Sequence, residues 1–275
     1  MDNYVEKYHI CQMPYVTTWN EEYFDYLLAK ESNRKTRKWP KYPDSLRRTM
    51  VELLAKAARE LNFDLATLWR AVDIFDELPH QKNTSLVAST CLWIASKTLI
   101  DDAGSDKDFY ELQCATDVRQ PRSQFATMER NIFECIGWDM AYVSPVEFIE
   151  NWFVTTRYLP VNLAMKKREV LEICKLFLME STVRHYRASM IAASCIAVYR
   201  IRCNYFLPWP RILQSMTRYS ESDIQDCVES VKKSLGVMSH PELDVDILKP
   251  EKRRRLELCV CFWKSSKSTY VSVID

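Results

Sequence analysis

Glycine is scarce in this chain: only three of the 275 residues are glycine, namely Gly104, Gly137 and Gly236. Each falls where a helical pattern of apolar residues stops, and glycine commonly ends helices because it tolerates a left-handed backbone. So few glycines leave little room for tight hairpins or for loops that cradle phosphate groups. The sequence therefore disfavours a β-sheet protein and a nucleotide-binding enzyme.

A strong net charge is also absent, because 38 Lys and Arg residues offset 37 Asp and Glu residues. A net charge of +1 argues against a broad electrostatic surface for nucleic acid, so we expect no direct nucleic-acid partner. The longest uncharged apolar run, Met190–Tyr199, is too short to cross a bilayer, which takes about 20 residues. Residues 2–9 are too polar for a signal sequence. We therefore expect a soluble intracellular protein with no membrane partner.

Metal-binding spacing is missing as well, although the chain has ten cysteines. No Cys-x-x-Cys or Cys-x-x-His pattern occurs, so we expect no metal and no cofactor. Five of the cysteines fall within helical patterns, where they are predicted to be small core residues in a reducing compartment. These five are Cys91, Cys135, Cys174, Cys195 and Cys227.

Two segments dense in small apolar residues, Val87–Lys97 and Ala188–Val198, are the strongest positive signal. Each is followed by an amphipathic helical pattern that ends at Gly137 or Gly236. Small side chains let neighbouring helices approach on every side, so each segment predicts the central helix of a bundle. The predicted fold is therefore all-α, with two similar five-helix bundles preceded by an N-terminal helix.

Helix boundaries follow from the apolar period and from capping residues. Asp64, Asn83 and Asp106 are predicted N-caps, and Ser144 followed by Pro145 starts a helix well. The helices are expected at about 20–32, then 44–61, 64–78, 84–100, 106–117 and 122–137, and finally 145–156, 166–180, 187–203, 209–217 and 221–235. The predicted organisation is an N-terminal helix and basic linker (1–43), a first bundle (44–142), a second bundle (143–238) and a tail (239–275).

Several of these segments resemble the cyclin family. Leu46–Leu54 resembles the Met-Arg-x-Ile-Leu-Val-Asp-Trp-Leu opening of the cyclin box, and Leu92–Lys97 matches the Leu-x-Ala-Ser-Lys end of its third helix. Leu68–Asp76 resembles the second box helix, and Met128–Asp139 resembles the fifth box helix and its exit. In the second bundle, similarity to the C-terminal box of A- and B-type cyclins comes from Trp209-Pro210 and Tyr219, and similarity to the D-type as well from Met190–Ala192. The resemblance implies a divergent member with tandem cyclin boxes and no catalytic centre.

The same resemblance implies a function and a site. Such a protein would activate a cyclin-dependent protein kinase by positioning the kinase's αC helix, in the nucleus and cytoplasm, for cell-cycle progression or transcription. Lys97 would donate hydrogen bonds to backbone carbonyls of the kinase, and Glu129 would accept them from backbone amides. Without the resemblance, these two residues are simply a solvated lysine and a surface acid. Further kinase contacts would come from Ile132, Phe133 and Trp138, and from Tyr23, Phe24 and Leu27, which equally fit packing on their own domain.

The first box helix carries two further implications of the resemblance. Arg47 and Asp76 would form a salt bridge between the first two helices of the box. Leu46, Met50 and Leu53 match an apolar patch that docks Arg-x-Leu motifs of substrates in several cyclins. Lys56 replaces the acid that would meet the motif's Arg, and like charges repel, which argues against such docking. The compact sequence also fits a virally encoded cyclin as one origin.

Three other functions remain open. Asp101, Asp102 and Asp106 resemble, superficially, the Mg²⁺ site of all-helical terpene synthases. A scaffold of the TFIIB type also carries two cyclin folds, but its zinc ribbon and basic face have no counterpart here. A transcriptional cyclin could recruit polymerase- or Mediator-associated machinery through its tail. In that tail, Lys252, Arg253, Arg254 and Arg255 form either a nuclear import signal or a solvated turn.

Overall fold

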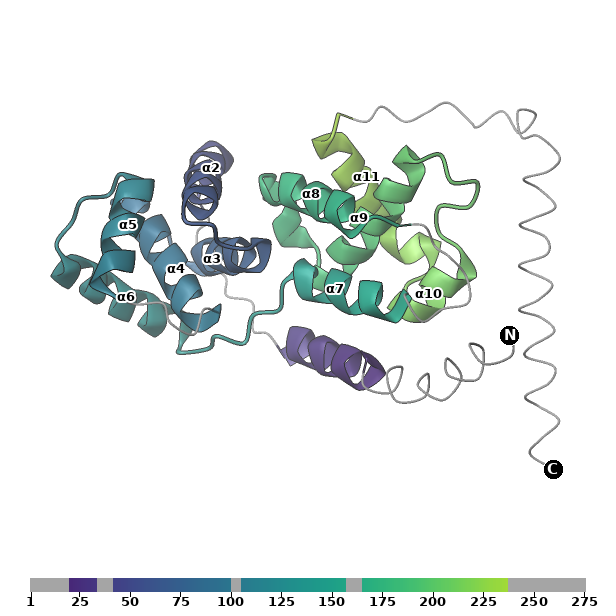
Figure 1. Cartoon of the computed structure of the whole chain (residues 1–275), viewed down its shortest axis with the longest axis horizontal. Helices are drawn as coiled ribbons and strands as arrows, with labels where there is room; N and C mark the ends of the chain where they lie inside the picture. Colours follow the sequence, from purple (N-terminus) through teal and green to yellow (C-terminus); the bar gives the residue numbers. More distant parts are fainter. Residues whose placement is uncertain (1–19, 34–41, 100–104, 157–164, 237–275) are drawn as a thin grey trace, which may run out of the picture.

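The protein, represented by a computed structural model, is described over residues 20–33, 42–99, 105–156 and 165–236. Within these ranges every regular element is a helix, as the scarcity of glycine and the apolar period predict. Figure 1 shows two helical bundles side by side, with α2 and α3 of the first bundle facing α8 of the second. The predicted tandem architecture is confirmed.

The first bundle contains five helices, each within two residues of its predicted bounds. They are α2 (Asp44–Glu60), α3 (Leu65–Glu77), α4 (Thr84–Leu99), α5 (Asp106–Thr116) and α6 (Arg122–Ile136). The small-residue helix α4 packs against α2, α3, α5 and α6. Its residues from Leu86 to Ser96 are all buried, so the prediction of a central helix is confirmed.

The second bundle repeats this arrangement. Its elements are α7 (Pro145–Thr156), α8 (Lys167–Leu178), the short 3-10 helix η1 (Ser181–His185), α9 (Ala188–Arg202), α10 (Arg211–Thr217) and α11 (Glu221–Ser234). The central helix is α9, which packs against α7, α8 and α11 and is buried from Ile191 to Arg200. The helix η1 was not predicted, because a single 3-10 turn has no apolar period long enough to detect.

Two of the predicted helix caps are present. Asp64 accepts a hydrogen bond from the Thr67 backbone N–H at 2.7 Å and so caps α3. Asn83 accepts a longer bond from the Leu86 N–H at 3.4 Å at the start of α4. Each side-chain oxygen satisfies a backbone donor that has no partner within its helix.

The prediction that Asp106 caps α5 is wrong. The N-cap is Ser105, which forms a reciprocal capping box with Asp108: the Ser105 N–H donates to Asp108 at 3.0 Å. Asp106 lies in the first helical turn, points into solvent and pairs with Arg122. The capping box prevails because it satisfies two backbone donors, whereas Asp106 alone would satisfy one.

The N-terminal helix (residues 20–33) packs on the second bundle. Its Phe24 ring lies against Phe148 and Trp152 of α7, with ring centroids 6.0 and 5.8 Å apart. The Glu31 carboxylate accepts hydrogen bonds from the backbone N–H and the hydroxyl of Ser189, at 2.8 and 2.7 Å. Glu31 therefore caps the central helix α9 from outside the bundle.

Arg47 joins the two bundles. Its guanidinium is fully buried and forms the predicted salt bridge with Asp76 of α3, with the shortest N–O distance at 2.8 Å. The remaining nitrogen, Nη1, donates to the backbone carbonyls of Leu178, Met179 and Glu180, at 3.1 to 3.3 Å. One side chain therefore binds α2, α3 and the C-terminal end of α8 together.

We predict that Arg47→Ala lowers the free energy of unfolding by about 3–5 kcal/mol, because it leaves the Asp76 carboxylate buried without its charge partner. Arg48→Ala is the matched control, since Arg48 is on the same helix but exposed and should change stability by less than about 1 kcal/mol. Urea unfolding followed by circular dichroism measures both. Equal losses for the two variants would contradict the account of Arg47.

Burial should also decide which cysteine thiols react in the folded protein. Burial raises the pKa of the Cys91 and Cys195 thiols well above the ordinary value and that of Cys227 to about 12. Because only the thiolate reacts, these three should resist iodoacetamide at pH 8 in the folded protein, whereas exposed Cys114 and Cys203 should react. Isotope-coded labelling with mass spectrometry, before and after urea, measures this. Native labelling of Cys195 as fast as Cys203 would contradict it.

Candidate functional site

An ion pair between α4 and α6 brings the two predicted polar residues together. Lys97, in the last turn of α4, donates a hydrogen bond from Nζ to Oε1 of Glu129, near the middle of α6. The Lys97 and Glu129 side chains are 31% and 21% exposed, so both remain partly open to solvent. A lysine at this end of a helix also interacts favourably with the helix dipole. The pair is thus held in place and open to a partner.

Trp93 lies beneath the ion pair and was not predicted as part of the site. The Lys97 ammonium lies 5.3 Å from the centre of the Trp93 ring, a cation–π arrangement. The Trp93 ring is itself held edge-on against Phe109, with centroids 5.6 Å apart. Trp93 precedes Lys97 by one helical turn, and this spacing was the sequence signal that could have identified it.

An aromatic stack of half-buried Phe133 and exposed Trp138 continues the site along α6. Phe133 lies one turn after Glu129 on the same helix face, and its ring stacks on Trp138 with centroids 5.0 Å apart and planes 8° from parallel. The Trp138 N–H donates to the Phe133 carbonyl at 2.9 Å and the Gly137 N–H to Glu134 at 3.2 Å, which together form a Schellman motif. Trp138 is nevertheless 67% exposed, far more than ending the helix requires.

The backbone at Trp138 is unusual. Its φ of 62° is in the left-handed region, which bulky residues seldom adopt and which costs about 1–3 kcal/mol. Gly137 has the same φ of 62° without that cost, since it lacks a Cβ atom. The chain therefore holds a large apolar ring at the surface in a strained conformation.

The predicted apolar kinase contacts separate into surface and core. Ile132 is fully buried and faces the core, on the side of α6 away from solvent, which favours packing on its own domain over a kinase contact. Phe24 and Leu27 are also buried, and Phe24 packs on α7, which favours the packing alternative. Tyr23 is 43% exposed, and burial together with the nearby Glu147 carboxylate raises its pKa, so its hydroxyl stays a hydrogen-bond donor.

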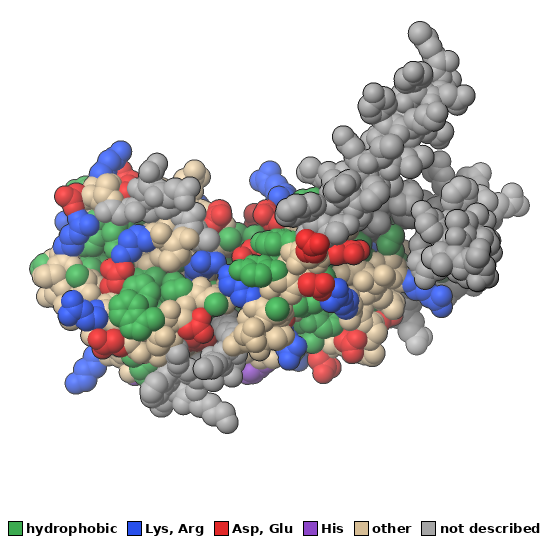
Figure 2. Space-filling model, turned by 90° about the horizontal axis from the view of Figure 1, so that it is seen from below, with side chains coloured by type: hydrophobic (Ala, Val, Ile, Leu, Met, Phe, Trp, Pro, Cys, Tyr) green, Lys and Arg blue, Asp and Glu red, His purple; other side chains and the backbone are tan. Residues whose placement is uncertain are grey.

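Hydrophobic side chains reach the surface in both bundles on the side of the molecule where the N-terminal helix lies (Figure 2). They are separated by charged side chains rather than merged into one large area. On this chain the exposed large aromatic residues include Tyr23, Tyr26 and Trp138. Such discrete aromatic anchors beside charges are typical of a specific protein interface.

The three apolar residues of α2 that match a docking patch face largely inward. Met50 is buried, and Leu46 and Leu53 are half-buried and packed against the core, so little of their apolar surface is available to a substrate motif. The exposed side of α2 instead carries ion pairs between Arg48 and Glu52 and between Lys56 and Glu60. Met50 turns inward because it follows Arg47 by three positions and so shares its core-facing side.

Some predicted residues lie outside the part of the chain that the structure describes. They are Asp101 and Asp102 and the basic cluster of the tail, Lys252, Arg253, Arg254 and Arg255. In the described part of the chain, no three His, Cys, Asp or Glu side chains are placed to hold a metal ion together. No helix in the same ranges has the length and hydropathy needed to span a membrane.

Comparison with known families finds two matches in tandem. The family described as "Cyclin, N-terminal domain" matches residues 22–141, and "Cyclin, C-terminal domain" matches residues 144–246. The two matches follow the two bundles and add the N-terminal helix to the first of them.

Similar proteins are cyclins of several kinds. A G2/mitotic-specific cyclin of Antirrhinum majus is 26% identical over 201 residues, covering 69% of this chain and 43% of that protein. Cyclin puc1 of Schizosaccharomyces pombe is 22% identical over 245 residues, covering 82% and 67%. The match to this chain spans less than half the length of the Antirrhinum cyclin and of a cyclin B2-2 of Oryza sativa.

Solved structures share the fold. A viral cyclin from herpesvirus saimiri superposes with a TM-score of 0.65 at 14% identity, covering 78% of this chain and 96% of that one. A chain of the yeast RNA polymerase II CTD kinase complex has a TM-score of 0.52 at 16% identity, covering 78% and 74%. At these identities the likeness shows the fold alone.

Proposed function

Because this chain belongs to the cyclin family, whose members are regulatory subunits rather than enzymes, we propose that it binds and activates a cyclin-dependent protein kinase. The observation that carries the proposal is the surface formed by the Lys97–Glu129 pair, Phe133 and Trp138. It combines a charged pair that can bind backbone groups with an exposed aromatic anchor. That combination suits a helix laid into a groove.

The ion pair would open when the kinase binds. Lys97 would donate to backbone carbonyls at the start of the kinase αC helix, and Glu129 would accept from backbone amides. Lys97 and Glu129 would lose their mutual hydrogen bond, and each would gain bonds to the kinase backbone. Neither charge is therefore left without a partner in the complex. Partly buried, charge-assisted bonds of this kind fix the register of a helix in its groove.

Activation would follow from a population shift. A kinase is active when the Lys on its β3 strand pairs with the Glu of αC, and that pairing requires αC to lie inward. A protein that binds the inward position more tightly than the outward one moves the equilibrium toward it by the difference in affinity. The chain itself then contributes no catalytic group, and the aromatic stack supplies apolar contact area.

The choice between a cell-cycle and a transcriptional role depends on which kinase is bound. We therefore predict that, in a panel of purified cyclin-dependent kinases of both kinds, the full chain raises the phosphorylation rate of at least one by more than tenfold. Transfer of radiolabelled phosphate to a peptide substrate measures the rate, with each kinase alone as the control. Activation of no kinase by a chain shown to be folded by circular dichroism would overturn the proposal.

Exchanging the two charges tests whether Lys97 and Glu129 bind the kinase or only hold α4 and α6 together. We predict that Lys97→Ala and Glu129→Ala each weaken kinase binding by about 2–5 kcal/mol, because each leaves kinase backbone groups unpaired. The double variant Lys97→Glu with Glu129→Lys keeps an internal ion pair but exchanges the positions of the two charges. Each charge then faces the wrong backbone group of the kinase, so the affinity should stay low. Lys107→Ala, an exposed lysine of α5, is the control. Calorimetric titration measures all four, and restored affinity in the exchange would show that the pair is only structural.

A further inference from the structure

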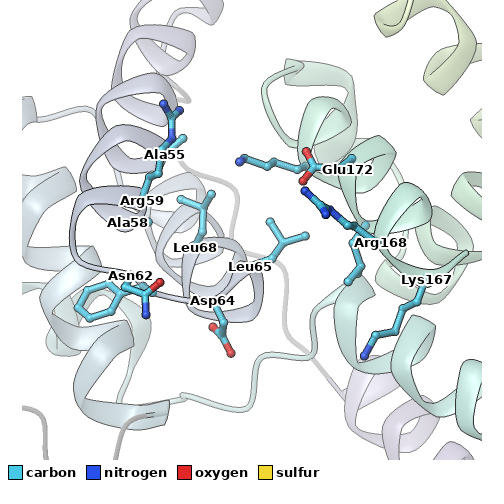
Figure 3. Close-up of a pocket in the computed structure, with 13 residues that line it drawn as sticks. Ala55, Ala58, Arg59, Asn62, Asp64, Leu65, Leu68, Lys167, Arg168 and Glu172 are labelled. Carbon is cyan, nitrogen blue, oxygen red and sulfur yellow. The ribbon is translucent and has the colours of Figure 1, made fainter.

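A groove of about 380 Å³ lies between the two bundles, on the side where the α2–α3 turn faces α8 (Figure 3). Its apolar surface comes from Ala55, Ala58, Leu65 and Leu68 of the first bundle and from Leu171 of the second. Leu65 and Leu171 are half-buried and packed against the core, so they are fixed and still partly open to a ligand. The groove therefore offers a rigid apolar floor shared by both bundles.

The rim of this groove is basic. Arg59, Arg168 and Lys175 line it, and none of the three side chains has an ion pair or a hydrogen bond anywhere in the described chain. The Asp64 carboxylate on the same rim is already engaged, since it accepts bonds from the Thr67 backbone and hydroxyl at 2.7 and 2.6 Å.

One further cation and one further acid complete the rim. Lys167 is the further cation, and it pairs with Glu150 at 3.0 Å. Glu172 is the further acid, and because the Asp64 carboxylate is engaged, it is the remaining acid of the rim. In Figure 3 the Arg168 and Glu172 side chains extend from α8 toward Leu65 and Leu68 on the opposite side. Three unpaired cations against one acid make the groove suitable for an acidic, partly apolar peptide.

We propose that residues 242–248 of this same chain, which lie outside the described residues, occupy the groove. Three acids, Glu242, Asp244 and Asp246, alternate there with apolar residues. In an extended peptide this period of two places the acids on one side and Leu243, Val245 and Ile247 on the other. The apolar side would cover the floor while the three acids meet the three unpaired cations of the rim.

The position of α11 supports this occupant. α11 ends at Ser234 and packs directly against α8, the helix that carries Arg168 and Lys175 (Figure 1). The five residues 237–241 can span at most about 18 Å when extended. A tether this short raises the effective concentration of the peptide to about the millimolar range, so individually weak contacts suffice.

The bound segment would act as a strap. Because the floor and rim come from both bundles, residues 242–248 would bridge α2 and α3 to α8 at the surface, where Arg47 bridges them in the interior. The strap requires no kinase, so it is tested on the isolated full chain and its failure leaves the proposed function untouched.

Photocrosslinking tests the strap. With p-benzoylphenylalanine in place of Ile247, ultraviolet light should crosslink the tail to residues 55–68 and 167–175, as identified by mass spectrometry. Arg168→Glu with Lys175→Glu should lower the crosslink yield at least fivefold, and adding Asp244→Lys with Asp246→Lys should restore it. Arg130→Glu with Lys233→Glu makes the same charge change outside the groove and should leave the yield unchanged.

Four results would overturn the strap. Crosslinks to other segments would place the tail elsewhere, and an unchanged yield in the Arg168→Glu, Lys175→Glu variant would remove the charge argument. Crosslinks between chains that rise with protein concentration would make a second copy the occupant. Failure of the reversed tail to restore the yield, with the fold intact by circular dichroism, would show that the acids do not meet these cations.

Discussion

The fold depends on one buried guanidinium. Arg47 has no exposed surface, and its three nitrogens are bonded to the Asp76 carboxylate and to three carbonyls at the end of α8. A buried charge is costly unless its hydrogen-bond donors are satisfied, and the observed position of α8 relative to α2 and α3 supplies the carbonyls that satisfy them. The side chain therefore specifies how the two bundles meet. The groove between Leu65 and Leu171 lies between the same three helices that Arg47 joins.

A different use of charge appears at the surface of the first bundle. The Lys97–Glu129 pair is partly exposed, so it contributes little to stability, yet it lies on a Trp93 ring that is itself held by Phe109. Next to it, the chain tolerates a left-handed backbone at Trp138 in order to end α6 and to expose the ring. A reachable charged pair and a strained, exposed aromatic residue are costly features for a fold alone. They are consistent with a surface whose partner is another protein.

Much of the fold was predictable from the sequence, because the apolar period, the small-residue helices and the glycines all act locally. The prediction that failed at Asp106 failed because Ser105 and Asp108 cooperate in a capping box, which a single-residue preference does not detect. Ile132 and Phe133 are adjacent, and only the packing of α6 decides which of them faces the core. The bonds of Arg47 to α8 and the basic groove could not be predicted, because each joins residues about 100 or more positions apart in sequence that meet only in the folded chain.

If this chain binds a kinase as proposed, Lys97 and Glu129 give up their mutual hydrogen bond for bonds to the kinase backbone. The decisive measurement is a structure of the chain bound to a kinase that it activates, with side chains resolved. We expect the Lys97–Glu129 bond to be broken and Trp138 to be covered, with Lys97 donating to carbonyls and Glu129 accepting from amides next to the kinase αC helix. An intact Lys97–Glu129 bond with Trp138 still exposed in an active complex would contradict this expectation.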